Sequence, residues 1–133
     1  MLSVRMAVGF KGRVDLINAA IDRDIPTVER LLSEGAIPDL TDRQGWTALH
    51  FAAQNNDAET AKILLKHGAP LESRDLFGNT PLWRAVFSYR GAADCISVLL
   101  DAGANPDLAN DHGVSPRSLA ASISNYDTRT FFE

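Results

Sequence analysis

The stretch DRQGWTALHFAA (residues 42–53) decides the fold of this chain, because related stretches follow it at regular distances. DLFGNTPLWRAV occupies residues 75–86, 33 positions later, and NDHGVSPRSLAA occupies residues 110–121, another 35 positions on. A second marker, LLxxGA, begins at positions 31, 64 and 99 and has the same two offsets. Because two separate markers share one period, the chain is predicted to be an array of repeats.

The markers divide the chain into one domain of four units with a short N-terminal arm. The first unit lacks the Gly-x-Thr opening and the last unit stops early, which is typical of terminal repeats that face water on one side. The predicted arm covers residues 1–12, and the units cover about residues 13–41, 42–74, 75–109 and 110–133.

Each unit is predicted to fold as helix, turn, helix and loop. Thr47 has a side chain suited to cap a first helix, and a second helix is predicted over residues 58–66. Gly68 follows this second helix and is expected to stop it in a left-handed conformation. The same roles are expected for Thr80 and Ser115 as caps, Pro81 and Pro116 as first helical residues, Pro26 at the start of a second helix, and Gly35 and Gly103 as stops.

The segments between units are predicted to be extended and to close in tight turns. The stretch that follows Gly68 is too short and too rich in turn residues for a helix. Tight turns are expected at Gly45, Gly78 and Gly113, because glycine supplies the backbone angles that such turns require.

This pattern resembles the ankyrin repeat, whose usual signature is D-x-x-G-x-T-P-L-H-x-A-A followed by L-L-x-x-G-A-x. Residues 42–53 match it closely, whereas Trp83 replaces the usual His and Arg117 replaces the usual Leu. The resemblance covers about residues 13–124. It implies an all-α ankyrin-repeat solenoid of about four helix-turn-helix units, with short β-hairpin loops beside the first helices. It further implies that the concave face binds proteins and that His50 braces neighbouring loops.

Composition excludes several classes of protein. The chain has 133 residues, of which 45% are hydrophobic and 23% are charged, and these shares are ordinary for a globular protein. Its net charge of −4 argues against general affinity for nucleic acid or for an anionic membrane surface. Cys95 is the only cysteine, so no intrachain disulfide can form, and a cytoplasmic location is expected.

The sequence carries no pattern that predicts catalysis or a cofactor. The three histidines, His50, His67 and His112, do not share helical metal-binding spacing, and Cys95 has no second thiol to complete a zinc site. Neither the phosphate-binding GxxxxGK pattern nor the GxSxG nucleophile pattern occurs. We therefore expect no enzyme activity, no metal and no cofactor, and we expect Cys95 to be a small buried apolar residue.

The residues expected to bind a partner lie at hairpin tips, on the open side of first helices and in the turns between helices. Leu76 and Phe77 are large apolar residues at a hairpin tip that is expected to be exposed to solvent. A two-residue insertion in the third unit contributes Tyr89 and Arg90 to a loop between helices. Packing between repeats is the alternative for Trp46 and Trp83, and for Trp83 it is favoured. The complete candidate set is Arg43, Gln44, Trp46, Gln54, Leu76, Phe77, Asn79, Tyr89, Arg90, Asp111 and His112.

These candidates predict a stand-alone, non-enzymatic binding protein that is monomeric when free. The whole chain resembles small bacterial ankyrin immunity proteins, which implies an inhibitor that occludes the active site of a cognate toxin. Such a partner would be a basic toxin or nuclease domain, with Asp42 and Asp111 steering its approach. The alternative is a scaffold or regulatory adaptor that links cellular proteins. The last ten residues, with Tyr126, Phe131 and Phe132, would either cap the array or dock a partner.

Overall fold

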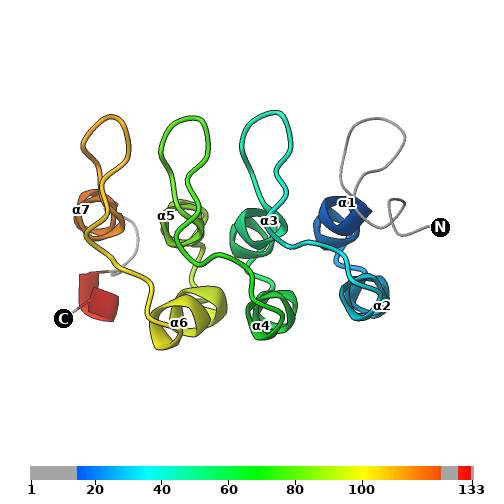
Figure 1. Ribbon diagram of the computed structural model, residues 1–133. Helices are drawn as coiled ribbons and strands as arrows, with labels where there is room; N and C mark the ends of the chain where they lie inside the picture. Colours follow the sequence, from blue (N-terminus) through cyan, green and yellow to red (C-terminus); the bar gives the residue numbers. More distant parts are fainter. Residues whose placement is uncertain (1–14, 124–128, 133) are drawn as a thin grey trace.

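The helices of this chain stand in two rows, and hairpin loops extend beyond one of them (Figure 1). The computed structural model describes residues 15–123 and 129–132. Inner helices α1, α3, α5 and α7 form one row, and outer helices α2, α4 and α6 form the other. The described helices are α1 (Asp15–Ile21), α2 (Ile25–Ser33), α3 (Ala48–Gln54), α4 (Ala58–Lys66), α5 (Pro81–Phe87), α6 (Asp94–Asp101), α7 (Pro116–Ser122) and the 3-10 helix η2 (Arg129–Phe132).

The inner helices begin at the residues that the sequence indicates. Thr47 accepts a hydrogen bond from the His50 backbone N–H, and Thr80 and Ser115 make the equivalent bonds at the starts of α5 and α7. These bonds satisfy backbone donors that have no partner within the helix. Pro81 opens α5 and confirms the prediction for that position.

The outer helices use aspartate caps in the first two units but not in the third. Asp24 accepts a hydrogen bond from the Thr27 backbone N–H, and Asp57 accepts the corresponding bond at the start of α4. The longer turn before α6 places Ala93 at the cap position, where no side-chain hydrogen bond forms. Instead, the Cys95 backbone N–H donates to Asn56 Oδ1 of the preceding unit at 2.9 Å. The insertion therefore replaces a local cap by a bond between repeats.

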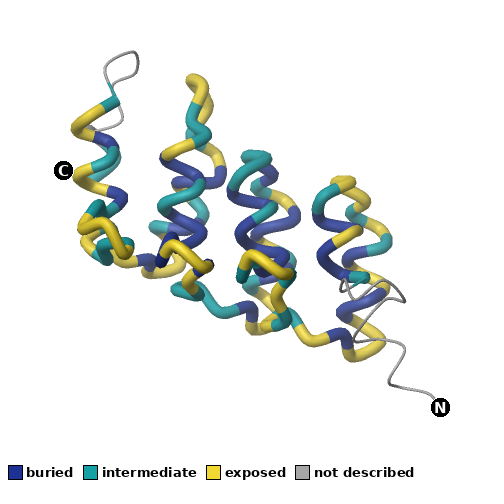
Figure 2. The backbone as a smooth tube through the Cα atoms, turned by 90° about the horizontal axis from the view of Figure 1, so that it is seen from above, coloured by how far each residue is buried: buried dark blue, intermediate teal, exposed yellow. Residues whose placement is uncertain are grey.

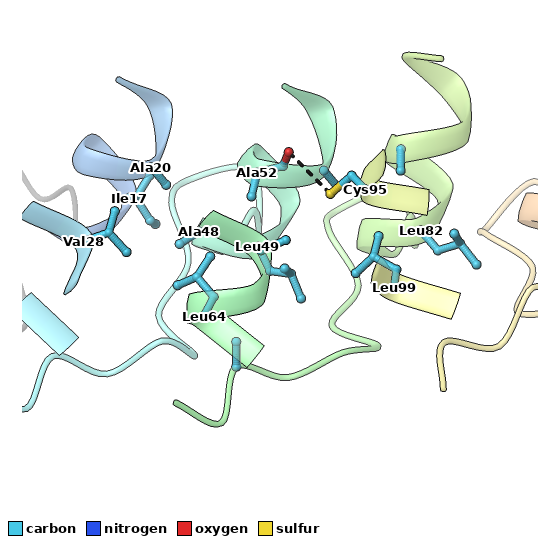
Figure 3. Close-up of a cluster of buried hydrophobic side chains, with 14 of the residues drawn as sticks. Ile17, Ala20, Val28, Ala48, Leu49, Ala52, Leu64, Leu82, Cys95 and Leu99 are labelled. Carbon is cyan, nitrogen blue, oxygen red and sulfur yellow. Dashed lines mark hydrogen bonds between the residues drawn. The ribbon is translucent and has the colours of Figure 1, made fainter. Parts of the chain in front are cut away.

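The core runs continuously between the two rows of helices and along the array (Figures 2 and 3). Leu49 on α3 and Leu64 on α4 are fully buried, as are their counterparts Leu82 on α5 and Leu99 on α6. Burying one leucine side chain contributes roughly 1.5–3 kcal/mol. Small residues such as Ala52 allow adjacent repeats to approach closely, and the buried residues of adjacent units belong to one continuous cluster.

The hairpin loops are stacked in register through hydrogen bonds from one loop to the next. The Leu76 backbone N–H donates to the Gln44 carbonyl oxygen at 3.0 Å, and that of Asp111 donates to the Phe77 oxygen at 2.9 Å. A side chain at Gly78 would push against the next loop, because an added Cβ would lie 2.9 Å from the Asp111 backbone nitrogen, and the Gly78 backbone has a φ of +81°. The loops take hairpin form, but no β-strand is assigned within the described residues.

The described part of the C-terminus folds back onto the array. Phe131 and Phe132 are half-buried, and the Phe131 ring meets Tyr89 edge-on with 5.5 Å between ring centroids. Arg117 Nη1 on α7 donates to the Phe132 carbonyl oxygen at 2.7 Å. For residues 129–132, the described part of the last ten residues, these contacts favour the capping alternative. Tyr126 and the N-terminal arm of residues 1–12 lie outside the described residues.

Candidate functional site

The hairpin tips carry six of the predicted binding residues, and all six are exposed. Leu76 is 65% exposed and Phe77 is 57% exposed, which is high for large apolar side chains. The remaining exposed members of this set are Arg43, Gln44, Asp111 and His112. Asp42, predicted to steer a partner, is half-buried, and its Oδ1 accepts hydrogen bonds from the backbone N–H groups of Gln44 and Trp46.

Asn79 was predicted to lie on the open surface, and the structure shows that this placement is wrong. The residue is only 4% exposed, and its side-chain Oδ1 accepts a hydrogen bond from Asn110 Nδ2 at 2.9 Å. Its carbonyl oxygen lies 2.8 Å from His50 Nε2. The physical reason is the close approach of adjacent loops, which draws Asn79 between its neighbours. Asn79 therefore joins three repeats.

An aromatic–arginine cluster lies on the inner helices α3 and α5 and on the residue that precedes the cap of α3. We define the cluster as Trp46, Phe51, Trp83, Arg84 and Phe87. The Arg84 guanidinium carbon lies 4.4 Å from the centroid of the Trp46 ring. It also lies 5.4 Å from the Trp83 ring and 5.6 Å from the Phe87 ring. Trp46 packs on Phe51 with centroids 4.6 Å apart, and Trp83 stacks on Phe87 at 5.2 Å. One cation therefore connects the aromatic side chains of two repeats.

The cluster is partly open to solvent. Phe87 is 48% exposed, and the other four members are half-buried. Trp83 thus combines the two sequence-based alternatives, since it packs within the cluster and still contributes to the surface. Phe51, which is half-buried on α3, was not among the predicted candidates.

A buried aspartate holds Arg84 in place. Asp75 Oδ1 accepts hydrogen bonds from the backbone N–H groups of Phe77 and Asn79, both at 2.9 Å. Its other oxygen, Oδ2, lies 3.5 Å from Arg84 Nη2. The Asp75 side chain is wholly buried, so loss of Arg84 would leave a buried carboxylate without its cation. The same carboxylate therefore orders the hairpin that carries Phe77 and positions the arginine of the cluster.

Gln54, Tyr89 and Arg90 do not join the hairpin tips. Each lies at or beyond the C-terminal end of its inner helix, whereas the hairpins precede the N-terminal ends. All three are among the residues that line a cleft at the turns between helices, together with Arg23, which the sequence analysis did not identify. Tyr89 is half-buried, and its ring contacts Phe131. The predicted set is thus divided between two ends of the inner helices.

Two further titratable side chains, those of His50 and Cys95, are buried among the helices. His50 is buried, and burial lowers its pKa below the ordinary value of 6.5. Cys95 is buried as predicted, its Sγ lies 3.7 Å from the Ala52 carbonyl oxygen (Figure 3), and burial raises the pKa of its thiol to about 12. Among the described residues, no group of three His, Cys, Asp or Glu side chains could hold a metal ion. No helix in the described ranges is long and apolar enough to span a bilayer.

Comparison with known proteins agrees with the repeat geometry. A family profile described as ankyrin repeats (3 copies) matches residues 16–110. An Arabidopsis thaliana protein, E3 ubiquitin-protein ligase KEG, is 37% identical across 71% of this chain and 6% of its own length. The mouse RelA-associated inhibitor is 35% identical across 68% of this chain and 11% of its own length. Protein PhlB of Serratia liquefaciens is 36% identical across 79% of this chain and 46% of its own length.

The matched region spans less than half of each of these three relatives. What they share with this chain is therefore the repeat array and not the remainder of each protein. The capped inner helices, the stacked hairpins and the profile match over residues 16–110 lead to one conclusion. This chain belongs to the ankyrin-repeat family of protein-interaction modules.

Proposed function

We propose that this chain is an inhibitor that binds one partner protein and covers its active site, as an immunity protein covers its cognate toxin. The observation that carries the proposal is the aromatic–arginine cluster at α3 and α5, with the exposed Phe77 on the adjoining hairpin. Tryptophan and arginine are enriched among the residues that dominate binding energy at protein interfaces. The proposal places the chain in the cytosol, where its single cysteine stays reduced.

The rigidity of the cluster supports tight binding. Arg84 is held by Asp75 and by three aromatic rings, so its side chain loses little further freedom when a partner arrives. Four repeats offer enough area for a standard interface of roughly 800 Å² on this side. A single preorganised face fits a protein that covers one partner.

Charge supports a basic partner such as a nuclease domain of a toxin. The chain carries a net charge of −4, and Asp111 is exposed at a hairpin tip. Exposed charge of one sign speeds the approach of a partner of opposite sign more than it strengthens the final complex. Among the relatives, the mouse protein is named an inhibitor, which is consistent with an inhibitory role for an ankyrin array.

A scaffold or adaptor is the second candidate function. It is favoured by the separation of the predicted binding residues into two sets, at the hairpins and at the turns between helices. Two surfaces allow two partners to bind at once, whereas occlusion of one active site needs only one surface.

The test begins with cross-linking in the source cells. A photo-reactive phenylalanine analogue replaces Phe77, and in a matched control it replaces Lys62 on the outer helix α4, which is also exposed. We expect one protein to be captured from position 77 and not from position 62. Equal capture from both positions would contradict the proposed face.

The captured protein then separates the two functions. Its own activity is measured while the purified chain is added in increasing amounts. An inhibitor abolishes that activity at equimolar ratio, whereas an adaptor leaves the activity unchanged and binds a second protein simultaneously. Unchanged activity would overturn the inhibitor proposal.

A further inference from the structure

A cleft at the turns between helices is the strongest unassigned feature of the described residues. Its volume is about 320 Å³, within the lower part of the range of small ligand sites. The turn that follows α1 supplies Arg23, the end of α3 supplies Gln54, and the turn after α5 supplies Tyr89 and Arg90. Three consecutive repeats therefore form one concave site, away from the hairpin tips.

Arg23 occupies a backbone position that is unfavourable for an arginine. Its φ is +57°, and the residues at the equivalent position in the next two units, Asn56 and Gly91, have φ values of +52° and +107°. Glycine takes this conformation without steric cost, and asparagine takes it more readily than most residues. An arginine at this position does not stabilise the backbone of the turn. We therefore look for the function of Arg23 in the contacts of its side chain.

The Arg23 side chain is directed across the repeat boundary. Its Nη2 donates to the Asn55 carbonyl oxygen, in the turn of the next unit. A guanidinium has five N–H donors, so this bond leaves others for a ligand. Arg90 lines the same cleft, and its Nη1 donates to the carbonyl oxygen of its neighbour Tyr89 at 2.7 Å.

The charged side chains that line the cleft are positive, although the net charge of the chain is −4. Two arginines line the cleft, and no carboxylate is among its lining residues in the described part of the chain. Asp24, which follows Arg23, is occupied as the cap of α2 through the backbone N–H and hydroxyl of Thr27. Guanidinium groups pair with carboxylates through two parallel hydrogen bonds, so the site is complementary to a carboxylate.

The amide side chain in the cleft favours a peptide over a bare anion. Gln54 Oε1 is buried and has no hydrogen-bond partner within the described residues. This acceptor needs an N–H or O–H donor, and a peptide carries N–H donors whereas a fully ionised anion such as sulfate carries no donor. The geometry points to a second binding site, in which Arg23 and Arg90 hold an Asp or Glu side chain from an acidic segment of a partner protein, and Gln54 turns to accept a peptide N–H. This inference goes beyond the proposed inhibitory face and does not depend on it.

A paired peptide array tests the inference directly. Synthetic octapeptides are arranged in pairs that differ only by Glu against Gln or Asp against Asn, and the purified chain is bound to them. We expect the acidic member of the binding pairs to bind about tenfold more tightly, as charge-assisted hydrogen bonds require. Binding without an acidic preference would overturn the proposal.

Variants locate the bound peptide. Fluorescence anisotropy measures the affinity of the best acidic peptide for the wild-type chain, Arg23→Gly and Arg90→Gln, and we expect a loss of about tenfold in each variant. Arg23→Gly should leave the thermal unfolding midpoint nearly unchanged, because the relief of the left-handed backbone position offsets the loss of the hydrogen bond to Asn55. Arg30→Gln removes an exposed arginine outside the cleft and should change the affinity by less than about twofold. Full binding by both cleft variants would refute the site.

Inorganic sulfate is the second probe. Sulfate carries the negative charge of the proposed ligand but is fully ionised at neutral pH, so it has no N–H or O–H to offer Gln54. We expect it to displace the acidic peptide only weakly. If sulfate competes as tightly as the peptide itself, the cleft is a simple anion site and the peptide assignment fails. None of these outcomes depends on the partner captured at Phe77, so the two proposals fail independently.

Discussion

The Nε2 atom of His50 lies 2.8 Å from the carbonyl oxygen of Asn79, so a side chain on α3 braces the hairpin of the next repeat. On the other side of the ring, Nδ1 accepts a hydrogen bond from the Thr47 backbone N–H at 3.1 Å. Nδ1 therefore carries no proton, and Nε2 donates to Asn79. This arrangement requires a neutral imidazole, and it ties the cap of a helix to the stacking of the loops.

Stability should therefore depend on pH through His50. Burial lowers the pKa of His50 below 6.5 in the folded chain, so the unfolded chain binds the proton more readily. The free energy of unfolding should decrease as the pH falls through 6.5, and this decrease should end below the folded-state pKa. Urea denaturation at about pH 7.5 and about pH 5.5 measures it. His50→Gln should reduce the difference in free energy of unfolding between the two pH values. A difference as large as in the wild-type chain would contradict the role of His50. His67→Gln, at an exposed site, serves as the control.

Two identical substitutions distinguish buried from exposed leucines. Leu64 is fully buried on α4, and Leu64→Ala should lower the free energy of unfolding by about 2–5 kcal/mol. Leu76 is 65% exposed at a hairpin tip, and Leu76→Ala should change the free energy of unfolding by less than about 0.5 kcal/mol. Urea denaturation gives both values, and equal losses would show that the burial of one side chain has been misassigned.

Two glycines test the packing of the loops. Gly35 and Gly78 both have positive φ, but a Cβ at Gly35 would meet no atom within 4 Å. Gly35→Ala should therefore show only the conformational cost, about 1–2 kcal/mol. Gly78→Ala adds a clash with Asp111 in the next loop and should cost more. The difference between the two thermal unfolding midpoints is the measurement, and a smaller loss at Gly78 would argue against loops in register.

Cys95 should be unreactive in the native chain. Its thiol is buried and its pKa is raised to about 12, so almost no thiolate exists near neutral pH. A disulfide reagent such as dithionitrobenzoate should react with it at the rate at which the chain opens, and at once in denaturant. Rapid labelling under native conditions would contradict the burial of Cys95 against α3.

The sequence predicts those features of the fold that depend on local hydrogen bonds. Thr47 and Asp57 cap helices through bonds that reach only three residues along the chain, so their roles can be recognised from spacing. The period of the repeats then indicates which faces meet. Resemblance to the ankyrin signature adds the bracing role of His50, and the structure confirms it.

The candidate site is less predictable because it depends on distances between repeats. Asn79 occupies a loop position that looks exposed in sequence, yet the approach of Asn110 buries it. Arginine is common at interfaces, so Arg84 can be noticed in the sequence. Its contact with Trp46 cannot be predicted in the same way, because the two residues belong to different units. Arg23 could have been found by aligning it with Asn56 and Gly91, because an arginine is anomalous at a position that favours glycine.

The central claim is that the aromatic–arginine cluster and the adjoining hairpin bind a partner protein. Isothermal titration of the purified chain with the protein captured at position 77 tests this most directly. Phe87→Ala and Phe77→Ala should each weaken binding about tenfold or more, because exposed aromatic side chains dominate such interfaces. Ile37→Ala removes a side chain as exposed as Phe87 but outside the cluster, and it should bind like the wild-type chain. Wild-type affinity in both phenylalanine variants, with unchanged thermal midpoints, would contradict the claim.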